Sequence, residues 1–288
     1  MNITDDCVDC IIGQIKKATD SLNCEKNLAK EINDEVLKRS KGFSYENTPP
    51  WVVRDVYKFL GKKLNKTDPL EQIKQDSITA ALKLIPYVQN KLSISNDKLF
   101  TAIKASVAGN VIDFASKEQF DLTHEIQNVF DTDFAINNYS LLKEKLNTIN
   151  KLMILADNSG ENVFDKVLLE TLKEFYPHIK LYYATRGKPV INDITTKEAY
   201  QIGIDKVASI VNSGVDTPGY EKSRASDSFN ELYENMPLII AKGMGNFECL
   251  EASNDKRIFF LFKVKCNVVA KCVKQDVGSI ILKNGENH

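Results

Sequence analysis

The chain of 288 residues is poor in histidine and tryptophan, with three histidines and one tryptophan. None of the histidines has a spacing that suits a zinc site. The net charge is −1, so no overall field would recruit nucleic acid or an anionic membrane surface. No apolar run reaches the roughly 18 residues of a transmembrane helix, and the polar, acidic start gives no signal peptide. We therefore expect a cytoplasmic protein without nucleic-acid or membrane partners.

Two common nucleotide-binding motifs are also missing. The sequence has no G-x-x-x-x-G-K-[ST], which argues against a nucleotide-cleaving P-loop. The first apolar strand-like segment is not followed by G-x-G-x-x-G, which argues against a dinucleotide cofactor.

Six cysteines are present, and only Cys7 and Cys10 form a close C-x-x-C pair. Cys266 and Cys272 are six residues apart, a spacing that suits a second pair of zinc ligands poorly. The pair also lies too near the N-terminus to follow a strand, as a thioredoxin-type motif does. We expect reduced, structural thiols, and metal or redox use of Cys7 and Cys10 stays open.

The pattern of apolar and polar residues divides the chain into three parts. Residues 1–125 carry apolar side chains at helical spacing, as in 11–15, 52–60, 76–88 and 97–107, and predict a helical domain. Residues 126–148 are rich in Asn and Asp and predict a connection. Residues 149–288 alternate short apolar runs with helical segments, which predicts a metal-binding α/β domain. Its expected fold is three-layered αβα, with a mostly parallel, Rossmann-like sheet. The expected strands are 151–156, 179–184, 207–211, 238–241, 258–264 and 280–282.

Polar residues follow four of these strands at the point where each one ends. They include Asp157 and Asn158 after the first strand, Arg186 and Asp193 after the second, and Lys242 at the end of the fourth. Any one of these loops could be an ordinary turn or helix cap. Ligands of open α/β sheets, however, bind outside the carboxyl ends of the strands. Four such loops at one edge favour a binding site.

The residue types at this edge indicate phosphate chemistry. Asp157, Asn158 and Asp193 offer oxygen ligands for a divalent ion of the Mg²⁺ or Mn²⁺ type. Lys242 is expected to meet a phosphate, with Arg186 as a second candidate cation. The turn before the next helix offers backbone N–H groups to the same anion, at Ser159, Gly160 and Glu161.

Three of these loops carry extended motifs: LADNSGENVFD at 155–165, RGKPVIND at 186–193 and AKGMGNFE at 241–248. The helical part adds AGNVIDF at 108–114 and TDP at 67–69 with Lys74. Together they resemble the damage-control phosphatase family of metal-dependent α/β proteins. The Cys7 and Cys10 pair and the Lys265-Cys266 pair are similar to its stand-alone prokaryotic branch.

The resemblance implies that Asp157, Asn158 and Asp193 bind the metal and are catalytic, and that Lys242 contacts the substrate phosphate. It also implies that Asn110 and Asp113 face the same cleft. The expected cofactor is a divalent ion (Mg, Mn, Co or Ni), and the expected partner is a small phosphorylated metabolite. A metal-positioned water would attack the phosphomonoester, although Asp157 as a covalent nucleophile stays open.

Two other functions fit parts of the pattern. An S-adenosylmethionine-dependent carboxyl methyltransferase has a similar sheet, but it usually carries a glycine-rich turn after the first strand, where this chain has Gly160 alone. A non-catalytic metal- or metabolite-binding protein would also use acidic loops. The sequence names neither the substrate nor the oligomeric state.

Overall fold

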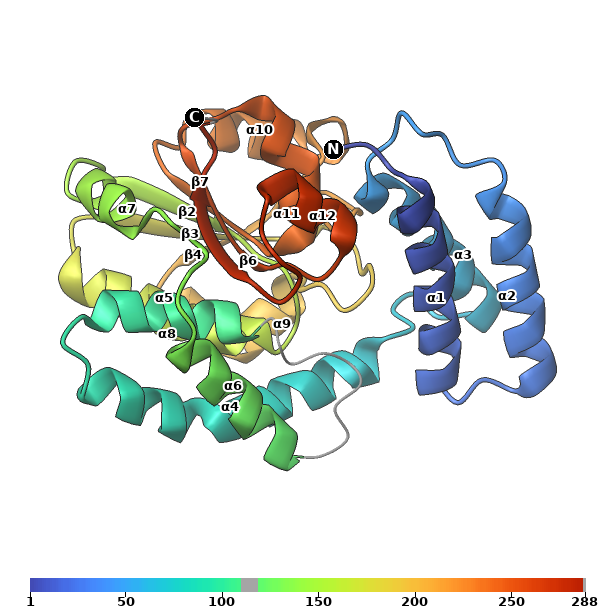
Figure 1. Cartoon of the computed structure of the whole chain (residues 1–288), viewed down its shortest axis with the longest axis horizontal. Helices are drawn as coiled ribbons and strands as arrows, with labels where there is room; N and C mark the ends of the chain where they lie inside the picture. The colour runs from blue at the N-terminus through green and yellow to red at the C-terminus, as the bar shows by residue number, and fades with distance from the viewer. Residues whose placement is uncertain (110–118, 287–288) are drawn as a thin grey trace.

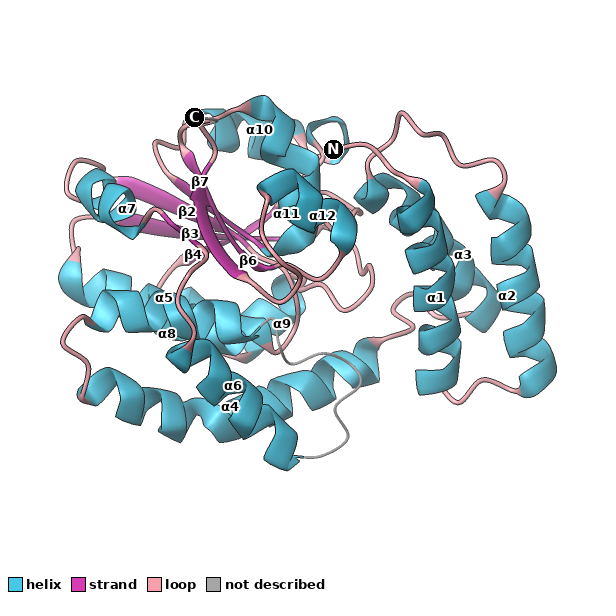
Figure 2. Cartoon of the chain, in the orientation of Figure 1, coloured by secondary structure: helices cyan, strands magenta, loops and turns pink. Residues whose placement is uncertain are grey.

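The computed structural model describes residues 1–109 and 119–286. Its seven strands form one sheet in the order β1-β7-β6-β5-β2-β3-β4, with helices on both faces (Figures 1 and 2). The strands from β6 to β4 run parallel, and β7 is antiparallel to β6. The predicted α/β class with a mostly parallel sheet is confirmed. The strands are β1 (Ile136–Asn137), β2 (Lys151–Leu155), β3 (Lys180–Thr185), β4 (Ser209–Asn212), β5 (Ile239–Lys242), β6 (Ile258–Lys263) and β7 (Ile280–Asn284).

The central strands are apolar along nearly their whole length because helices cover both faces. All four residues of β5 are buried, as are five of the six in β6. A strand buried on both sides reads as a continuous apolar run rather than an alternating one. This is why the sequence predicted β2 to β7 close to their observed bounds.

The first three helices form a unit beside the sheet (Figure 1). Their apolar faces pack on one another around fully buried Ile15, Ile32, Val36 and Leu60. At the start of the third helix, Thr48 accepts a hydrogen bond from the backbone N–H of Trp51 at 3.3 Å, and prolines occupy the first turn, where no N–H donor is needed. The helices are α1 (Asp5–Ser21), α2 (Lys26–Ser40) and α3 (Pro49–Leu64).

The next helices cover one face of the sheet. Apolar residues of α4 and α5 share a core with the crossover helix α8 and with strands β2, β3 and β5. The predicted domain boundary at residue 125 stays a proposal, but part of the N-terminal helical region packs directly on the α/β layer. The helices of this region are α4 (Glu71–Ser93), α5 (Lys98–Ala108), α6 (Gln119–Asp131), α7 (Tyr139–Leu146), α8 (Glu161–Phe175) and α9 (Thr196–Gln201).

A second core lies on the opposite face, under the three C-terminal helices. It includes Phe247 of α11, whose ring contacts those of Phe260 and Phe262 in β6. The segment predicted as a connection, 126–148, contributes edge strand β1 and helix α7. No helix of the described residues has the length and apolar character to cross a membrane. The remaining elements are α10 (Asp227–Glu234), α11 (Gly243–Leu250), α12 (Asn267–Val273) and the short 3₁₀ helices η2 (Ile204–Lys206), η3 (Lys222–Arg224) and η4 (Glu251–Ser253).

Candidate functional site

The candidate site lies where the order of the strands reverses. The chain runs from β2 to β3 and β4 on one side, and then returns to place β5 on the other side of β2. The connection after β2 therefore leads toward β3 and the connection after β5 toward β6, and a reversal of this kind at the carboxyl edge is the usual ligand position in such sheets. Asp157 follows β2, and Gly243 follows β5, at this reversal.

Asp193 joins Asp157 because two loops pair like short strands. Asn158 and Asp193 form an antiparallel bridge. Around it, the N–H of Ile194 donates to the carbonyl of Asp157, and the N–H of Ser159 donates to the carbonyl of Asn192, both at 2.9 Å. The predicted set of Asp157, Asn158 and Asp193 is thus brought together by main-chain hydrogen bonds.

Two buried carboxylates share one arginine in this cluster. Arg186 donates from Nε to Asp193 Oδ2 at 2.7 Å, and its Nη2 lies 3.8 Å from Asp157 Oδ1. Burial, and then the charge of Asp193, raise the pKa of Asp157 to about 7. Burial also raises the pKa of Asp193, against the opposing effect of Arg186. Burial thus opposes ionisation of both acids, and one arginine faces two carboxylates, so a cation would stabilise their ionised forms.

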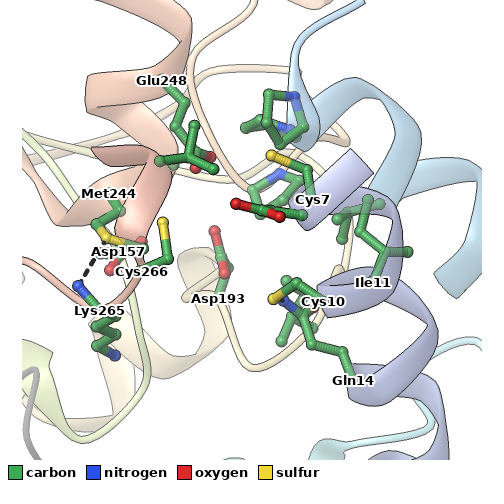
Figure 3. Close-up of a pocket in the computed structure, with 18 of the residues that line it drawn as sticks. Cys7, Cys10, Ile11, Gln14, Asp157, Asp193, Met244, Glu248, Lys265 and Cys266 are labelled. Atoms are coloured by element: carbon green, nitrogen blue, oxygen red, sulfur yellow. Dashed lines mark hydrogen bonds between the residues drawn. The ribbon is translucent and has the colours of Figure 1, made fainter. Parts of the chain in front are cut away.

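A cavity of about 410 Å³ opens onto these acids. Helix α1 and the start of α3 form one wall, and α11 and the segment before α12 form the other (Figure 3). The charged side chains on it are Asp6, Asp157, Asp193, Glu248 and Lys265, so acids outnumber bases. We call it the acidic cavity.

Three thiols line the acidic cavity as well. Cys7 and Cys10 project from α1, with Cys10 directed toward Asp193, and Cys266 lies on the opposite wall (Figure 3). All three are free cysteines. The C-x-x-C spacing was visible in the sequence, but its place beside the acids depends on how α1 packs. Glu248 from α11 and Lys265 from the segment before α12, which have no role assigned from the sequence, line the same cavity.

The predicted phosphate-binding turn lies behind the acids. Ser159 and Glu161 are each 1% exposed, and neither lines the acidic cavity. The N–H of Gly160 donates to Asn162 Oδ1 at 2.8 Å, and the N–H of Ser159 is already bonded to Asn192. Two of the three predicted amide donors therefore have internal acceptors, while the buried hydroxyl of Ser159 has no partner among the described residues.

Lys242 is enclosed rather than directed into the acidic cavity. It is 0% exposed, and its Nζ donates to Glu161, to Asp165 Oδ1 at 2.6 Å and to the carbonyl of Ser106 at 3.2 Å. Burial opposes its charge, but Asp165 and Glu161 outweigh burial and raise the pKa of Lys242. The three donors of the ammonium are thus used within the protein, and its predicted contact with phosphate remains a proposal.

Asn246 ties the strand ends together, a role that the sequence did not reveal. Its Nδ2 donates to the carbonyl of Lys242 at 2.7 Å and to that of Ala156 at 3.2 Å. Its Oδ1 accepts from the N–H of Tyr220 at 2.9 Å and faces Arg186 Nη1 at 3.5 Å. It therefore fixes β5, β2 and the arginine relative to one another. The predicted cleft residues Asn110 and Asp113 lie outside the described residues.

The donor set suits a hard divalent ion. Two carboxylates and the amide of Asn158 offer oxygen, which Mg²⁺ and Mn²⁺ prefer, and such ions keep several waters. Among the described residues, no group of three His, Cys, Asp or Glu side chains is arranged to hold a metal by itself. The candidate set has two carboxylates, so water and substrate oxygens would have to complete the coordination. The nitrogen Nη2 of Arg186, buried without a hydrogen-bond acceptor among the described residues, is placed for such an oxygen.

The fold and the site together define a Rossmann-like α/β protein with an acidic, oxygen-rich centre at the sheet reversal. The sequence model of the damage-control phosphatase ARMT1-like domain matches residues 3–281, and the chain belongs to this family. The predicted family is thereby confirmed.

Individual relatives are similar over their full length. A Pyrococcus horikoshii protein named damage-control phosphatase is 30% identical over 98% of this chain and 97% of its own. A protein of the same name from Archaeoglobus fulgidus is 28% identical over 98% of this chain and 99% of its own. The crystal structure of a DUF89 family protein from Pyrococcus horikoshii matches with a TM-score of 0.91 at 27% identity, over 99% of this chain and 100% of that one.

Proposed function

We propose that the protein is a phosphatase that hydrolyses a small phosphomonoester at Asp157, Asn158 and Asp193, with a divalent metal ion as cofactor. The observation that carries the proposal is the pair of buried carboxylates that opens onto the acidic cavity with one arginine between them. Relatives named damage-control phosphatases support the reaction class.

The oxygens of Asp157, Asn158 and Asp193 would hold the metal ion. A divalent cation at this position supplies charge neutralisation for the phosphoryl group and makes a nearby water more acidic. In the overall reaction, the water oxygen bonds to phosphorus, the ester P–O bond breaks, and the leaving alcohol takes up a proton.

The chain's own residues prepare this centre. Arg186 is fixed by Asp193 and Asn246, and its Nη2 is left to bind a phosphoryl oxygen. A fixed guanidinium in a site shielded from water stabilises charge on the transferred group without having to reorganise. Lys242 pairs with Glu161 and Asp165 behind the centre and offsets part of the negative charge that the phosphate would otherwise meet.

The proposal is tested by assaying phosphate release from a panel of phosphomonoesters with Mg²⁺, Mn²⁺, Co²⁺ or Ni²⁺, and with EDTA. We expect metal-dependent turnover, which Asp157→Asn and Asp193→Asn each lower by at least about 100-fold, or close to 3 kcal/mol of barrier. Asp205→Asn, which changes an exposed acid outside the acidic cavity, is the matched control. Full activity in Asp157→Asn would refute the assignment.

The same preparation separates the other functions considered. Metal binding by calorimetry without turnover on any ester would support a non-catalytic metal-binding protein. Binding of S-adenosylmethionine with no phosphate release would instead support a methyltransferase.

A further inference from the structure

A second cavity, of about 260 Å³, lies between α3 and the loop that carries Asp193. Five basic side chains line it: Arg54, Lys58, Lys62, Lys66 and Lys188. We call it the basic cavity. Ile191 lines both cavities, so the segment that holds Asp193 separates an acidic space from a basic one.

The basic residues of α3 gather on one face of the helix. Arg54, Lys58 and Lys62 follow one another at intervals of four residues, which places their side chains above one another. Like charges at this spacing destabilise a helix. Lys66 follows just after the helix, and Lys188 faces them from the loop. The sequence does not show that Lys188 lies near these residues, because the two segments meet only in the folded chain.

The acids at this cavity are already engaged elsewhere. Asp68 accepts from Lys74 at 2.7 Å, and Asp216 accepts two hydrogen bonds from Arg224, both at 2.7 Å. Among the described residues, no carboxylate lies within 4.0 Å of the ammonium groups of the four lysines of the basic cavity, by contrast with Lys63, which pairs with Glu31. The four lysines are exposed and line the cavity, and their positive charge is not offset there by a paired carboxylate of the described part of the chain.

Two further donors lack acceptors. Arg54 Nε is buried without a hydrogen-bond partner among the described residues, while its Nη2 pairs with Asp55 at 2.6 Å. Tyr57 is 8% exposed, lines the cavity, and its hydroxyl bonds to no described residue. The Arg54 nitrogen is the buried one of the two, and a buried donor without an acceptor is costly, so a ligand oxygen would satisfy it.

We propose that the basic cavity is a binding site for a multiply charged phosphate anion of the diphosphate class, separate from the Asp157 centre. Lysines from two walls surround the anion, and Arg54 and Tyr57 donate to its oxygens from the floor. The volume suits a diphosphate group, and four lysines around one space favour more than one negative charge. This site does not depend on the phosphatase proposal, since it uses none of the residues assigned there.

The test is calorimetric titration of the full-length, metal-free protein with inorganic pyrophosphate in the presence of EDTA. We expect saturable binding that weakens as salt is raised. Lys58→Ala and Lys188→Ala, on opposite walls, should each weaken it about fivefold or more. Lys63→Ala removes the same charge from the same helix, but on the side that faces Glu31, and should leave binding unchanged.

Three outcomes would overturn the proposal. Pyrophosphate could fail to bind at millimolar concentration, or bind equally well to the two cavity variants and the control. Alternatively, Asp157→Asn could change its affinity as strongly as Lys188→Ala does, which would place the anion at the acidic centre. Circular dichroism of each variant shows that an altered affinity does not come from unfolding.

Discussion

The α-carbon of Gly243 lies against the carboxylate of Asp157. A Cβ atom built on Gly243 would come within 1.9 Å of Asp157 Oδ2, far inside contact distance. The glycine also has φ +74°, a conformation that other residues rarely adopt. The loop after β5 thus closes onto the loop after β2 only because position 243 has no side chain.

Gly243→Ala should therefore displace Asp157 and remove activity together with metal affinity. We expect a loss of stability beyond the roughly 1–2 kcal/mol that a left-handed backbone costs alanine. Gly278→Ala is the matched control, because Gly278 has φ +98° and a Cβ atom added there would meet no described atom within 4 Å. Urea unfolding and metal titration measure both effects, and equal results for the two variants would contradict the steric argument.

Lys242→Met should destabilise the protein by about 3–5 kcal/mol, because it leaves Glu161 and Asp165 buried without their counter-charge. Adding Glu161→Gln to Lys242→Met should recover part of the loss, since one uncompensated acid is removed. Lys197→Met, which breaks an exposed pair with Glu71, should scarcely move the unfolding midpoint. If the double variant is no more stable than Lys242→Met, the uncompensated charge of Glu161 and Asp165 is not the source of the lost stability.

The sequence predicted what depends on local pattern. Strands β2, β3, β5 and β6 are largely apolar and buried. Asp157, Asn158 and Asp193 follow strands that are neighbours in the sheet, so their meeting could be expected. The direction of the Lys242 side chain could not be predicted. Its partner Asp165 lies one helical turn beyond Glu161, and both acids meet Lys242 only when α8 packs on the sheet. Cys7 and Cys10 reach the acidic cavity through α1, whose position depends on contacts far apart in sequence.

Metal-free stability should fall as pH rises from about 4 to about 8 and then level off. Burial raises the pKa of Asp157 to about 7 from the usual 3.8, and it raises the pKa of Glu248 to about 8 as well, so the folded state holds protons that the unfolded chain has released over this interval. Metal binding competes with the proton on Asp157, so affinity should rise over the same range. Thermal unfolding at pH 5.5 and 8, with and without Mg²⁺, measures both trends.

Asp157→Asn should weaken the metal-free dependence without abolishing it, because the substituted amide does not titrate while burial still raises the pKa values of Asp193, Glu161 and Glu248. Asp205→Asn provides the comparison with an exposed acid. Should the metal-free wild type be less stable at pH 5.5 than at pH 8, the buried acids would not dominate its pH response.

Alkylation of Cys10 should block the acidic cavity. Its side chain is exposed and directed toward Asp193, so an added carboxamidomethyl group would occupy space beside the acids (Figure 3). We expect iodoacetamide to remove most phosphatase activity from the wild type and little from Cys10→Ser. Cys272 is also exposed but does not line the cavity, so Cys272→Ser should stay as sensitive as the wild type. Peptide mass spectrometry identifies the modified thiol, and inactivation of Cys10→Ser at the wild-type rate would show that another group is responsible.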